Sequence, residues 1–413
     1  MIGMKEYIRK KRIFAVVFMV VIAVFSVVNL VHSVPALKEC VTGEAVSVAE
    51  LDAAINENLY ERMKFIEIYA YIQTLLDKRE CNNFSYIKDE QGFLHYASFF
   101  REEDTRLFEY AVRVKRLQDS VAGKGTKVLF VVPPGKYSLD FNEFRMGMPV
   151  NDPNAIVDEL MLHLNRLGIE TLDLRESLPN QQLSYKETFF KTDHHWTIPA
   201  AFYAMGEIVD KIEECFGEDL DPEDYYTELG NYEVVNYEKG MFGSMGRKTG
   251  AHFCGLEDFT AIWPRLSGEF YREYIMESGA RTEKQGSFAE VLMKTEILTE
   301  TRDIYSNSQY SLYLDGLSLY EKIVNQEKPD GCSMFMIRDS YMSPVMAFLM
   351  PMCGEIHAMW SLEETEELDV ETYLEEHTFD YIIVEVYPYN IESSAFNYFK
   401  GTEGGNNQNG KKG

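Results

Sequence analysis

The residues best suited to chemistry begin with an aspartate and a histidine two positions apart. Asp193 and His195 lie in the segment Lys-Thr-Asp-His-His-Trp-Thr, residues 191–197. In an extended segment, side chains two residues apart project to the same side. The carboxylate can then accept the imidazole Nδ1–H, which fixes the tautomer and leaves Nε2 free to take a proton. Such a pair forms a general base and needs a nucleophile from elsewhere in the chain.

The candidate nucleophile is Ser340, in the segment Met-Ile-Arg-Asp-Ser-Tyr-Met-Ser-Pro. It follows an apolar segment typical of a buried strand and precedes a predicted helix. In open α/β sheets, sites form at the carboxyl ends of the strands. Backbone N–H groups at the start of a helix can also hold an oxyanion. A serine in this position is equally a common helix N-cap, and spacing alone leaves both roles open.

Short apolar segments alternate with helical stretches along most of the chain. Strands are predicted at 127–134, 169–174, 333–339, 355–360 and 380–387. Helices are predicted at 103–121, 153–167, 199–216, from about 342, and at 362–376. This alternation predicts an α/β fold with a mainly parallel sheet. Residues 217–310 do not follow this alternation, because they contain many charged, Gly, Tyr and Asn residues. We expect an insertion or long loops there.

The N-terminal region has the features of a membrane anchor. Residues 13–34 contain no charged residue and match the ~20 apolar residues that a helix needs to cross a bilayer. Five basic residues precede them: Lys5, Arg9, Lys10, Lys11 and Arg12. The positive-inside rule then places the N-terminus in the cytoplasm and the rest outside. A cleaved signal peptide is the alternative, although the apolar run is long for one and no clear A-x-A site follows. Residues 47–79 predict a helix that either packs on the domain or docks a partner.

Composition indicates how large a core the chain can form, which partners it can bind and what its cysteines can do. The chain has 413 residues, 46% of them hydrophobic, enough for a sizeable core. A formal charge of −27 argues against nucleic-acid binding, which needs clustered Lys and Arg. Among six cysteines, Cys332 and Cys353 are a conceivable disulfide outside the membrane, and buried free thiols are the alternative.

A family resemblance adds to these readings. Asp-His-His-Trp-Thr at 193–197 is the name-giving motif of the DHHW proteins, and the chain resembles these proteins and the SGNH-like domains of alginate acetyltransferases. Further segments follow in the family's order at 55–65, 84–96, 128–140, 241–250, 310–316 and 336–344. The similarity covers about 50–395. It implies an SGNH or flavodoxin-like three-layer fold with a mainly parallel sheet, behind one transmembrane helix.

These features together predict a domain layout. We expect a cytoplasmic basic segment and anchor over 1–35 and a juxtamembrane helical region over 36–100. The SGNH-like domain is expected over 101–395, followed by a disordered tail over 396–413.

The resemblance also implies an activity. Asp193 would orient His195, His195 would act as general base and Ser340 as nucleophile, with His194 only a neighbour. The implied reaction is ping-pong O-acetylation of a cell-surface or exported polysaccharide, without a cofactor or metal. A multi-spanning membrane O-acyltransferase would supply the acyl group. The alternatives are a carbohydrate esterase and a non-catalytic glycan-binding or scaffold protein.

The oxyanion hole is where this chain departs from its relatives. They tend to carry Gly-Asn where this chain has Gly316-Leu317, and losing one oxyanion donor typically costs ~10²–10³ in rate. Gly243 and Ser244 are candidates for a backbone donor, or form a tight turn that needs positive φ. Arg247 and Trp196 are candidate substrate contacts.

A zinc site is the competing interpretation of the same motif. Asp193, His194 and His195 with His252 or Cys254 are suitable ligand types. The chain contains neither His-Glu-x-x-His nor Cys-x-x-Cys, so we favour the acyl-transfer reading.

Overall fold

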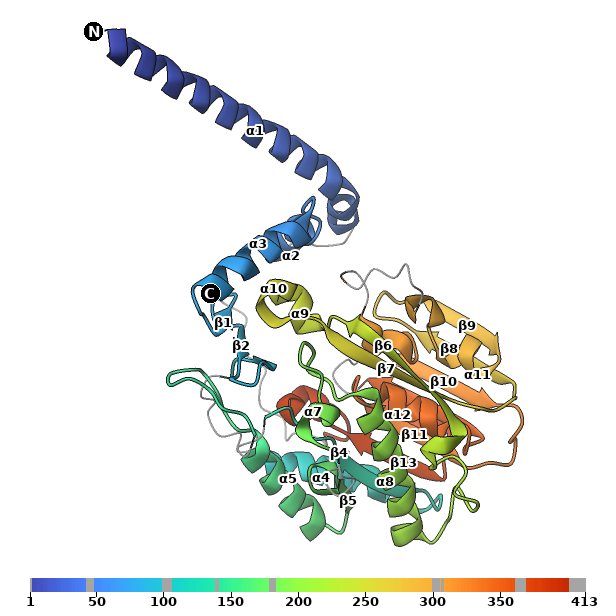
Figure 1. Ribbon diagram of the computed structural model, residues 1–413. Coiled ribbons are helices and arrows are strands. Elements are labelled where there is room, and N and C mark those ends of the chain that lie inside the picture. Colours follow the sequence, from blue (N-terminus) through green and yellow to red (C-terminus); the bar gives the residue numbers. More distant parts are fainter. Residues whose placement is uncertain are drawn as a thin grey trace, which may run out of the picture.

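The computed structural model of the protein describes residues 2–41, 48–98, 106–137, 141–177, 183–298, 305, 308–360 and 369–400. A long N-terminal helix, α1 (Ile2–Val41), projects away from a globular α/β body (Figure 1). Residues 401–413 of the tail predicted over 396–413, and residues 362–368 of the predicted acidic helix, lie outside the described residues.

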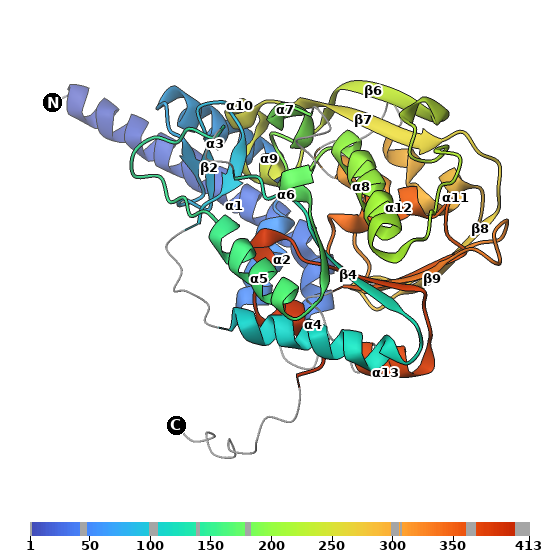
Figure 2. The ribbon, with the colours of Figure 1, turned by 90° about the horizontal axis from the view of Figure 1, so that it is seen from below.

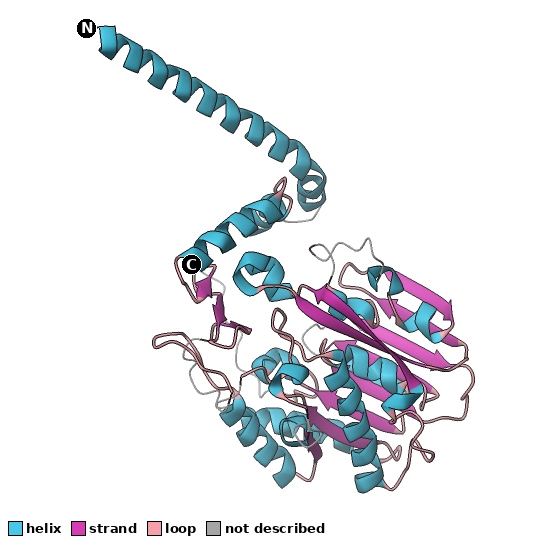
Figure 3. Ribbon diagram, in the orientation of Figure 1, coloured by secondary structure: helices cyan, strands magenta, loops and turns pink. Residues whose placement is uncertain are grey.

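An eight-stranded sheet forms the centre of the body (Figure 3). Its order is β5-β4-β13-β11-β12-β10-β8-β9. The first five strands are parallel: β5 (Glu170–Asp173), β4 (Lys127–Val132), β13 (Tyr381–Glu385), β11 (Ser333–Arg338) and β12 (Glu355–Trp360). The last three extend the sheet antiparallel: β10 (Tyr320–Asn325), β8 (Phe270–Ile275) and β9 (Arg281–Gly286). The predicted mainly parallel α/β sheet is confirmed.

Helices cover both faces of the sheet (Figure 2). One face carries α4 (Leu107–Ala122), α5 (Asn154–Arg166) and α13 (Val370–Glu376). The other carries α8 (Ile198–Phe216), α11 (Phe288–Leu292) and α12 (Met342–Leu349). Alternate residues of β4 point to opposite layers: Val128 and Phe130 join the first core, Leu129 and Val131 the second. A strand buried on both faces explains why its sequence is continuously apolar.

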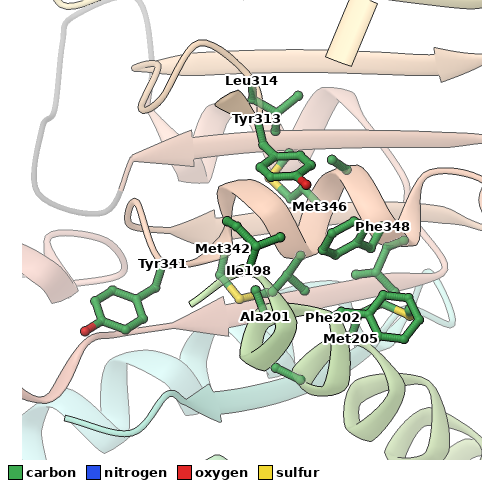
Figure 4. Packing of buried hydrophobic residues seen from close by; sticks show 14 of the residues in the cluster. Ile198, Ala201, Phe202, Met205, Tyr313, Leu314, Tyr341, Met342, Met346 and Phe348 are labelled. Atoms are coloured by element: carbon green, nitrogen blue, oxygen red, sulfur yellow. The ribbon is translucent and has the colours of Figure 1, made fainter. Parts of the chain in front are cut away.

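The packing of α8 against α12 brings two distant segments together (Figure 4). Ile198 and Phe202 of α8 share a core with Met342 and Met346 of α12. Thr197 caps α8, since its side chain accepts the Ala200 N–H. Each helix therefore begins directly after one of the predicted site segments, and their contact places those segments side by side.

The segment predicted as an insertion or long loops contains four strands and several short helices. β6 (Tyr232–Met241) and β7 (Glu257–Pro264) form an antiparallel ribbon, while β8 and β9 join the main sheet. Two short helices, α9 (Ser244–Thr249) and α10 (Ala251–Cys254), connect the ribbon strands. Long loops were therefore the wrong expectation. These strands are partly exposed, so polar residues interrupt their apolar pattern.

The region after α1 is also more divided than predicted. The expected helix over 47–79 forms α2 (Val48–Glu57) and α3 (Arg62–Leu75), separated where Glu61 adopts φ 58°. A small antiparallel sheet follows: β1 (Glu80–Cys81), β2 (Tyr86–Lys88) and β3 (Leu94–Tyr96). The remaining helices are α6 (Leu174–Ser177), α7 (Tyr185–Thr188), η2 (Leu229–Asn231), η3 (Thr295–Leu298), η4 (Gln309–Leu312), η5 (Pro388–Asn390) and η6 (Ser393–Phe396).

Helix α1 contains a stretch, Glu6–Lys38, that is long and apolar enough to cross a membrane, judged by length and composition. Almost all of its apolar side chains are exposed. A membrane span and a signal sequence share these properties.

Cys332 and Cys353, the conceivable disulfide partners, lie close together in the residues just before β11 and β12. The sulfur atoms of Cys332 and Cys353 lie 3.5 Å apart as free thiols.

Candidate active site

The structure brings Asp193, His195 and Ser340 into one hydrogen-bonded chain. His195 Nδ1 lies 2.6 Å from Asp193 Oδ1, and His195 Nε2 lies 2.7 Å from Ser340 Oγ. Asp193 and His195 are buried, whereas Ser340 is partly exposed. Although 145 positions separate the histidine from the serine, their geometry is that of an orienting acid, a general base and an activated hydroxyl.

Asp193 is held in its ionised form. Burial by itself would raise the pKa of this carboxyl group, because it disfavours the charged form. The charge and hydrogen bond of His195, together with the Ser244 N–H at 2.6 Å from Oδ2, outweigh burial and keep the pKa well below its usual value. The carboxylate can therefore stabilise an imidazolium on His195.

The backbone before Asp193 is held from two sides by Lys136, which is buried, and by Glu257, which is partly buried. Lys136, in the loop after β4, donates from Nζ to the Asp193 carbonyl at 2.6 Å and the Lys191 carbonyl at 3.1 Å. Glu257, at the start of β7, accepts the N–H groups of Lys191 and Thr192 at 2.6 and 2.7 Å. Burial lowers the pKa of Lys136 to about 8. The two residues fix the segment that positions the acid of the candidate triad.

Aromatic side chains hold the ring plane of His195, the candidate base. Tyr310 stacks on His195 with ring centroids 3.7 Å apart and an interplanar angle of 12°. The Trp196 indole N–H donates to the Tyr310 hydroxyl at 3.1 Å and to the Tyr341 carbonyl at 3.2 Å. Trp196 is fully buried. The prediction that it contacts substrate is therefore corrected: it supports the ring stacked on the base.

The turn that carries Ser340 is held by a pair of buried acids. Asp339 accepts the Tyr341 N–H at 2.9 Å and the Tyr387 N–H at 3.1 Å, while its own N–H donates to Glu385 at 2.9 Å. Burial, followed by the nearby charge of Asp339, raises the pKa of Glu385 well above its usual value. The buried site therefore favours the neutral form of Glu385 beside Asp339. Among the described residues the Ser340 N–H has no hydrogen-bond partner, which leaves this donor available for an oxyanion.

Gly243 and Ser244 serve the acid rather than an oxyanion. The Ser244 N–H is bonded to Asp193, and the Gly243 N–H donates to Thr192 Oγ1 at 2.8 Å. Gly243 has φ −66°, so the alternative of a turn with positive φ is also wrong. A Cβ at Gly243 would lie 2.5 Å from both Asp193 Cβ and the Thr192 carbonyl oxygen. Close approach of α9 to Asp193 is what requires glycine here.

The Gly316-Leu317 loop lies beside the nucleophile turn. Ser343, in the first turn of α12, donates from Oγ to the Gly316 carbonyl at 2.8 Å. Arg338 donates to Ser343 Oγ at 3.2 Å and to Ser318 Oγ at 3.2 Å, and so ties the loop to β11. Leu317 is partly buried, and its side chain offers no hydrogen-bond donor.

Two predicted neighbours of the site take different roles. Arg247 lies on α9 and donates to the Phe242 carbonyl at 3.3 Å, and burial lowers its pKa. Its contact with a glycan stays a prediction. His194 packs against His195 with ring centroids 3.8 Å apart. Burial, followed by the charge of His195, lowers the pKa of His194 to about 3, so it is neutral at physiological pH.

The alternative zinc ligands do not gather as envisaged. Among the described residues, ligand atoms of Asp193, His194 and His195 lie within 4.8 Å of one another, without His252 or Cys254. Those two residues belong to α10, which packs on α3. Both nitrogens of His195 are already within hydrogen-bond distance of Asp193 and Ser340.

Several supporting residues carry little signal in the sequence. Lys136 and Tyr310 lie in segments that the family resemblance singles out, at 128–140 and 310–316. Glu257 and Glu385 lie at strand ends, where a carboxylate is usually a solvated residue. Only the fold shows that Glu385 is buried and Glu257 partly buried.

Comparisons with known proteins support the fold assignment of the domain. Residues 90–240 match the model of the SGNH hydrolase-like domain of acetyltransferase AlgX, a stretch that includes Asp193 and His195 but not Ser340. No curated protein matches the chain.

Solved structures share the fold at low sequence identity. PatB1 from Bacillus cereus, solved with a sulfonyl adduct, aligns with TM-score 0.60 and 14% identity over 76% of this chain and 97% of its own. A DHHW family protein from Eubacterium siraeum aligns with TM-score 0.54 and 17% identity over 76% of this chain and 94% of its own. The resemblance drawn from the sequence is thus confirmed: the chain carries an SGNH hydrolase-like domain, similar to AlgX and to the DHHW proteins, behind one candidate membrane helix.

Proposed function

We propose that the protein is an extracytoplasmic acyltransferase that O-acetylates a cell-surface or exported polysaccharide with Ser340, His195 and Asp193. The observation that most strongly supports this proposal is the unbroken hydrogen-bond chain from Asp193 through His195 to Ser340. The match to an acetyltransferase domain supports acyl transfer as the reaction class.

The proposed reaction has two halves. Ser340 Oγ attacks the donor's carbonyl carbon while His195 Nε2 takes the hydroxyl proton, and Asp193 stabilises the imidazolium. The Ser340 N–H is placed to help hold the oxyanion. Collapse expels the donor's leaving group, which takes the proton from His195, and leaves an acyl ester on Ser340. A sugar hydroxyl then attacks that ester and gives its proton to His195, and the Ser340 oxygen takes this proton as it leaves, which restores the free site.

Location follows from the helix at the N-terminus. If α1 spans the membrane with its basic end in the cytoplasm, residues after it lie outside. Cytoplasmic acyl donors would then have to be carried across, which is the reason to propose a multi-spanning O-acyltransferase as partner.

The test is covalent labelling of the full-length chain in detergent. A sulfonyl fluoride should form an oxygen–sulfur bond at Ser340 with release of fluoride, and an activated acetyl ester should leave an acetyl group there. We expect mass spectrometry to locate both adducts on Ser340, and Ser340→Ala and His195→Ala to abolish them. A wild-type chain that stays unlabelled would support the non-catalytic scaffold instead.

A second measurement separates transferase from esterase. The acetylated chain is mixed with an oligosaccharide or with buffer alone. Transfer of the acetyl group to the sugar supports the transferase, whereas rapid loss to water without sugar acetylation supports the esterase.

A further inference from the structure

We infer that helix α3 is a membrane-surface helix, whose apolar face lies in the outer leaflet of the bilayer and holds the domain against it. The inference rests on the proposed membrane anchoring by α1. It concerns a surface that the triad does not use.

The face is large and faces away from the body. Five aliphatic or phenyl side chains recur along it at helical spacing and are 47–67% exposed: Phe65, Ile68, Ile72, Leu75 and, just past the helix end, Leu76. Tyr69 and Tyr71 flank them and are 37% and 51% exposed. The opposite side of α3 is buried at Ala70 and Gln73. Tyrosine beside aliphatic residues is typical of helices at the membrane–water interface.

Contacts of α1 with Phe65 of α3, and with Tyr60 just before α3, set the depth of α3 in the bilayer. The rings of Phe25 and Phe65 lie 5.6 Å apart, and the Tyr60 N–H donates to Asn29 Oδ1 at 2.7 Å. Counted from residue 13, the ~20 residues that cross the hydrocarbon core end near residue 32. At ~1.5 Å per residue, Phe25 then lies about 10 Å inside the outer boundary. Phe65 packs on it and must lie at a similar depth.

The direction of α3 agrees with this placement. Figure 1 shows α3 turning away from the line of α1 and running past α10 toward β1. A helix that crosses the direction of a membrane span runs along the bilayer surface. The net charge of −27 would repel anionic lipid, so the contact depends on apolar burial and not on charge attraction.

The same helix is connected to the candidate site. Glu67 of α3 accepts the N–H groups of Ala251 and His252 at 2.8 and 3.0 Å. Gly250, between α9 and α10, packs so closely on Ala70 that a Cβ there would lie 2.5 Å from the Ala70 Cβ. At its other end α9 donates the Ser244 N–H to Asp193. The bilayer surface would therefore lie only one short helix from the acid of the triad.

The test uses photo-cross-linking of the full-length chain in phosphatidylcholine vesicles. Benzoylphenylalanine is placed in turn at Ile72, at Val20 of α1, and at Leu162 of α5. Leu162 is a matched control, since it and Ile72 are both 48% exposed aliphatic residues on helices. We expect lipid adducts at Val20 and Ile72 and none at Leu162. Ile68 serves as a second α3 position, and sulfonyl labelling of Ser340 checks that each variant is folded.

The outcomes distinguish this inference from the proposal beneath it. Lipid adducts at Val20 but at neither α3 position would overturn the inference and leave the anchor intact. Adducts of the α3 positions with protein, whether a second copy or another chain, would overturn it in favour of a docking face. Absence of lipid adducts at Val20 as well would overturn the anchor and the inference together.

Discussion

At the scale of single residues, the hydrogen bond between Asp193 and His195 decides which tautomer the base adopts. Asp193→Asn keeps the shape but can present an N–H to Nδ1, so Nε2 would carry the proton and could no longer accept one from Ser340. We expect a loss of about 10⁴-fold in the rate of Ser340 acylation. Stopped-flow release of the leaving group measures it, with Asp119→Asn as the control, because this exposed aspartate of α4 makes the same change in net charge. A loss below tenfold would mean that His195 does not depend on Asp193.

Leu317 offers a gain-of-function test. Its loop is held against the nucleophile turn through Ser343 and Gly316. Leu317→Asn would add a side-chain donor where the relatives tend to have one. Since one such donor is worth ~10²–10³ in rate, we expect acylation to rise by at least tenfold. Leu317→Met, which adds no donor, is the control. Equal rates for the two variants would place this loop outside the oxyanion hole.

Lys136 makes a pH-dependent contribution to stability. Its pKa is about 8 in the folded protein and about 10.5 in the unfolded chain, so between these values the unfolded chain binds more protons. The contribution of Lys136 to the free energy of unfolding therefore rises with pH from 8 to 10.5, by at most ~1.4 kcal/mol per pH unit. Denaturant unfolding of wild type and Lys136→Met should give a difference that grows from pH 8 to 10. A constant difference would mean that Lys136 titrates normally.

At the scale of secondary-structure elements, α9 must approach Asp193 closely. Gly243→Ala would force a methyl group into Asp193 and Thr192, and α9 would have to move away. Since a shift of ~1 Å at a site can cost ~10² in rate, we expect about that loss in Ser340 labelling with the fold retained. Gly206→Ala is the matched control, because a Cβ on this α8 glycine meets nothing within 4 Å. Equal labelling of both variants would show that α9 does not position the acid.

The sequence predicts elements well where burial is uniform. β4, β11 and β13 contain uninterrupted apolar runs because both faces are covered, and His357 interrupts the run only in β12; the ranges of all four are close to those predicted. β9 has the sequence Arg-Thr-Glu-Lys-Gln-Gly and joins the sheet only through its pairing with β8. Such a strand depends on its neighbour, so its own residues do not reveal it.

The residues of the candidate site also differ in how far the sequence predicts them. Asp193 and His195 are predictable because both lie in one segment of seven residues. The pairing with Ser340 needed the resemblance, since it depends on the packing of α8 on α12. The contacts of Lys136 and Glu257 with the motif depend on how β6 and β7 fold over it, and nothing in their local sequence indicates these contacts.

At the scale of the whole molecule, the two thiols before β11 and β12 report on the compartment. The sulfur atoms of Cys332 and Cys353 lie 3.5 Å apart, so a small movement would allow the ~2.05 Å bond of a disulfide. If the domain lies outside the membrane, we expect this pair to be oxidised in protein taken from cells. Mass spectrometry of a non-reduced digest should then find the two peptides linked. Alkylation of both thiols in freshly lysed cells would argue for a reducing compartment.

The strand order also governs when during synthesis the site can exist. β4, near the start of the domain, pairs with β13, near its end, and β11 lies between β13 and β12. The turn bearing Ser340 is therefore completed only after residue 385 has taken its place beside it. In a chain exported from its N-terminus, the Asp193 and His195 segment emerges first and waits for almost two hundred further residues. No partly exported chain would hold an activated serine, so the proposed acyl transfer could begin only after the whole domain had crossed.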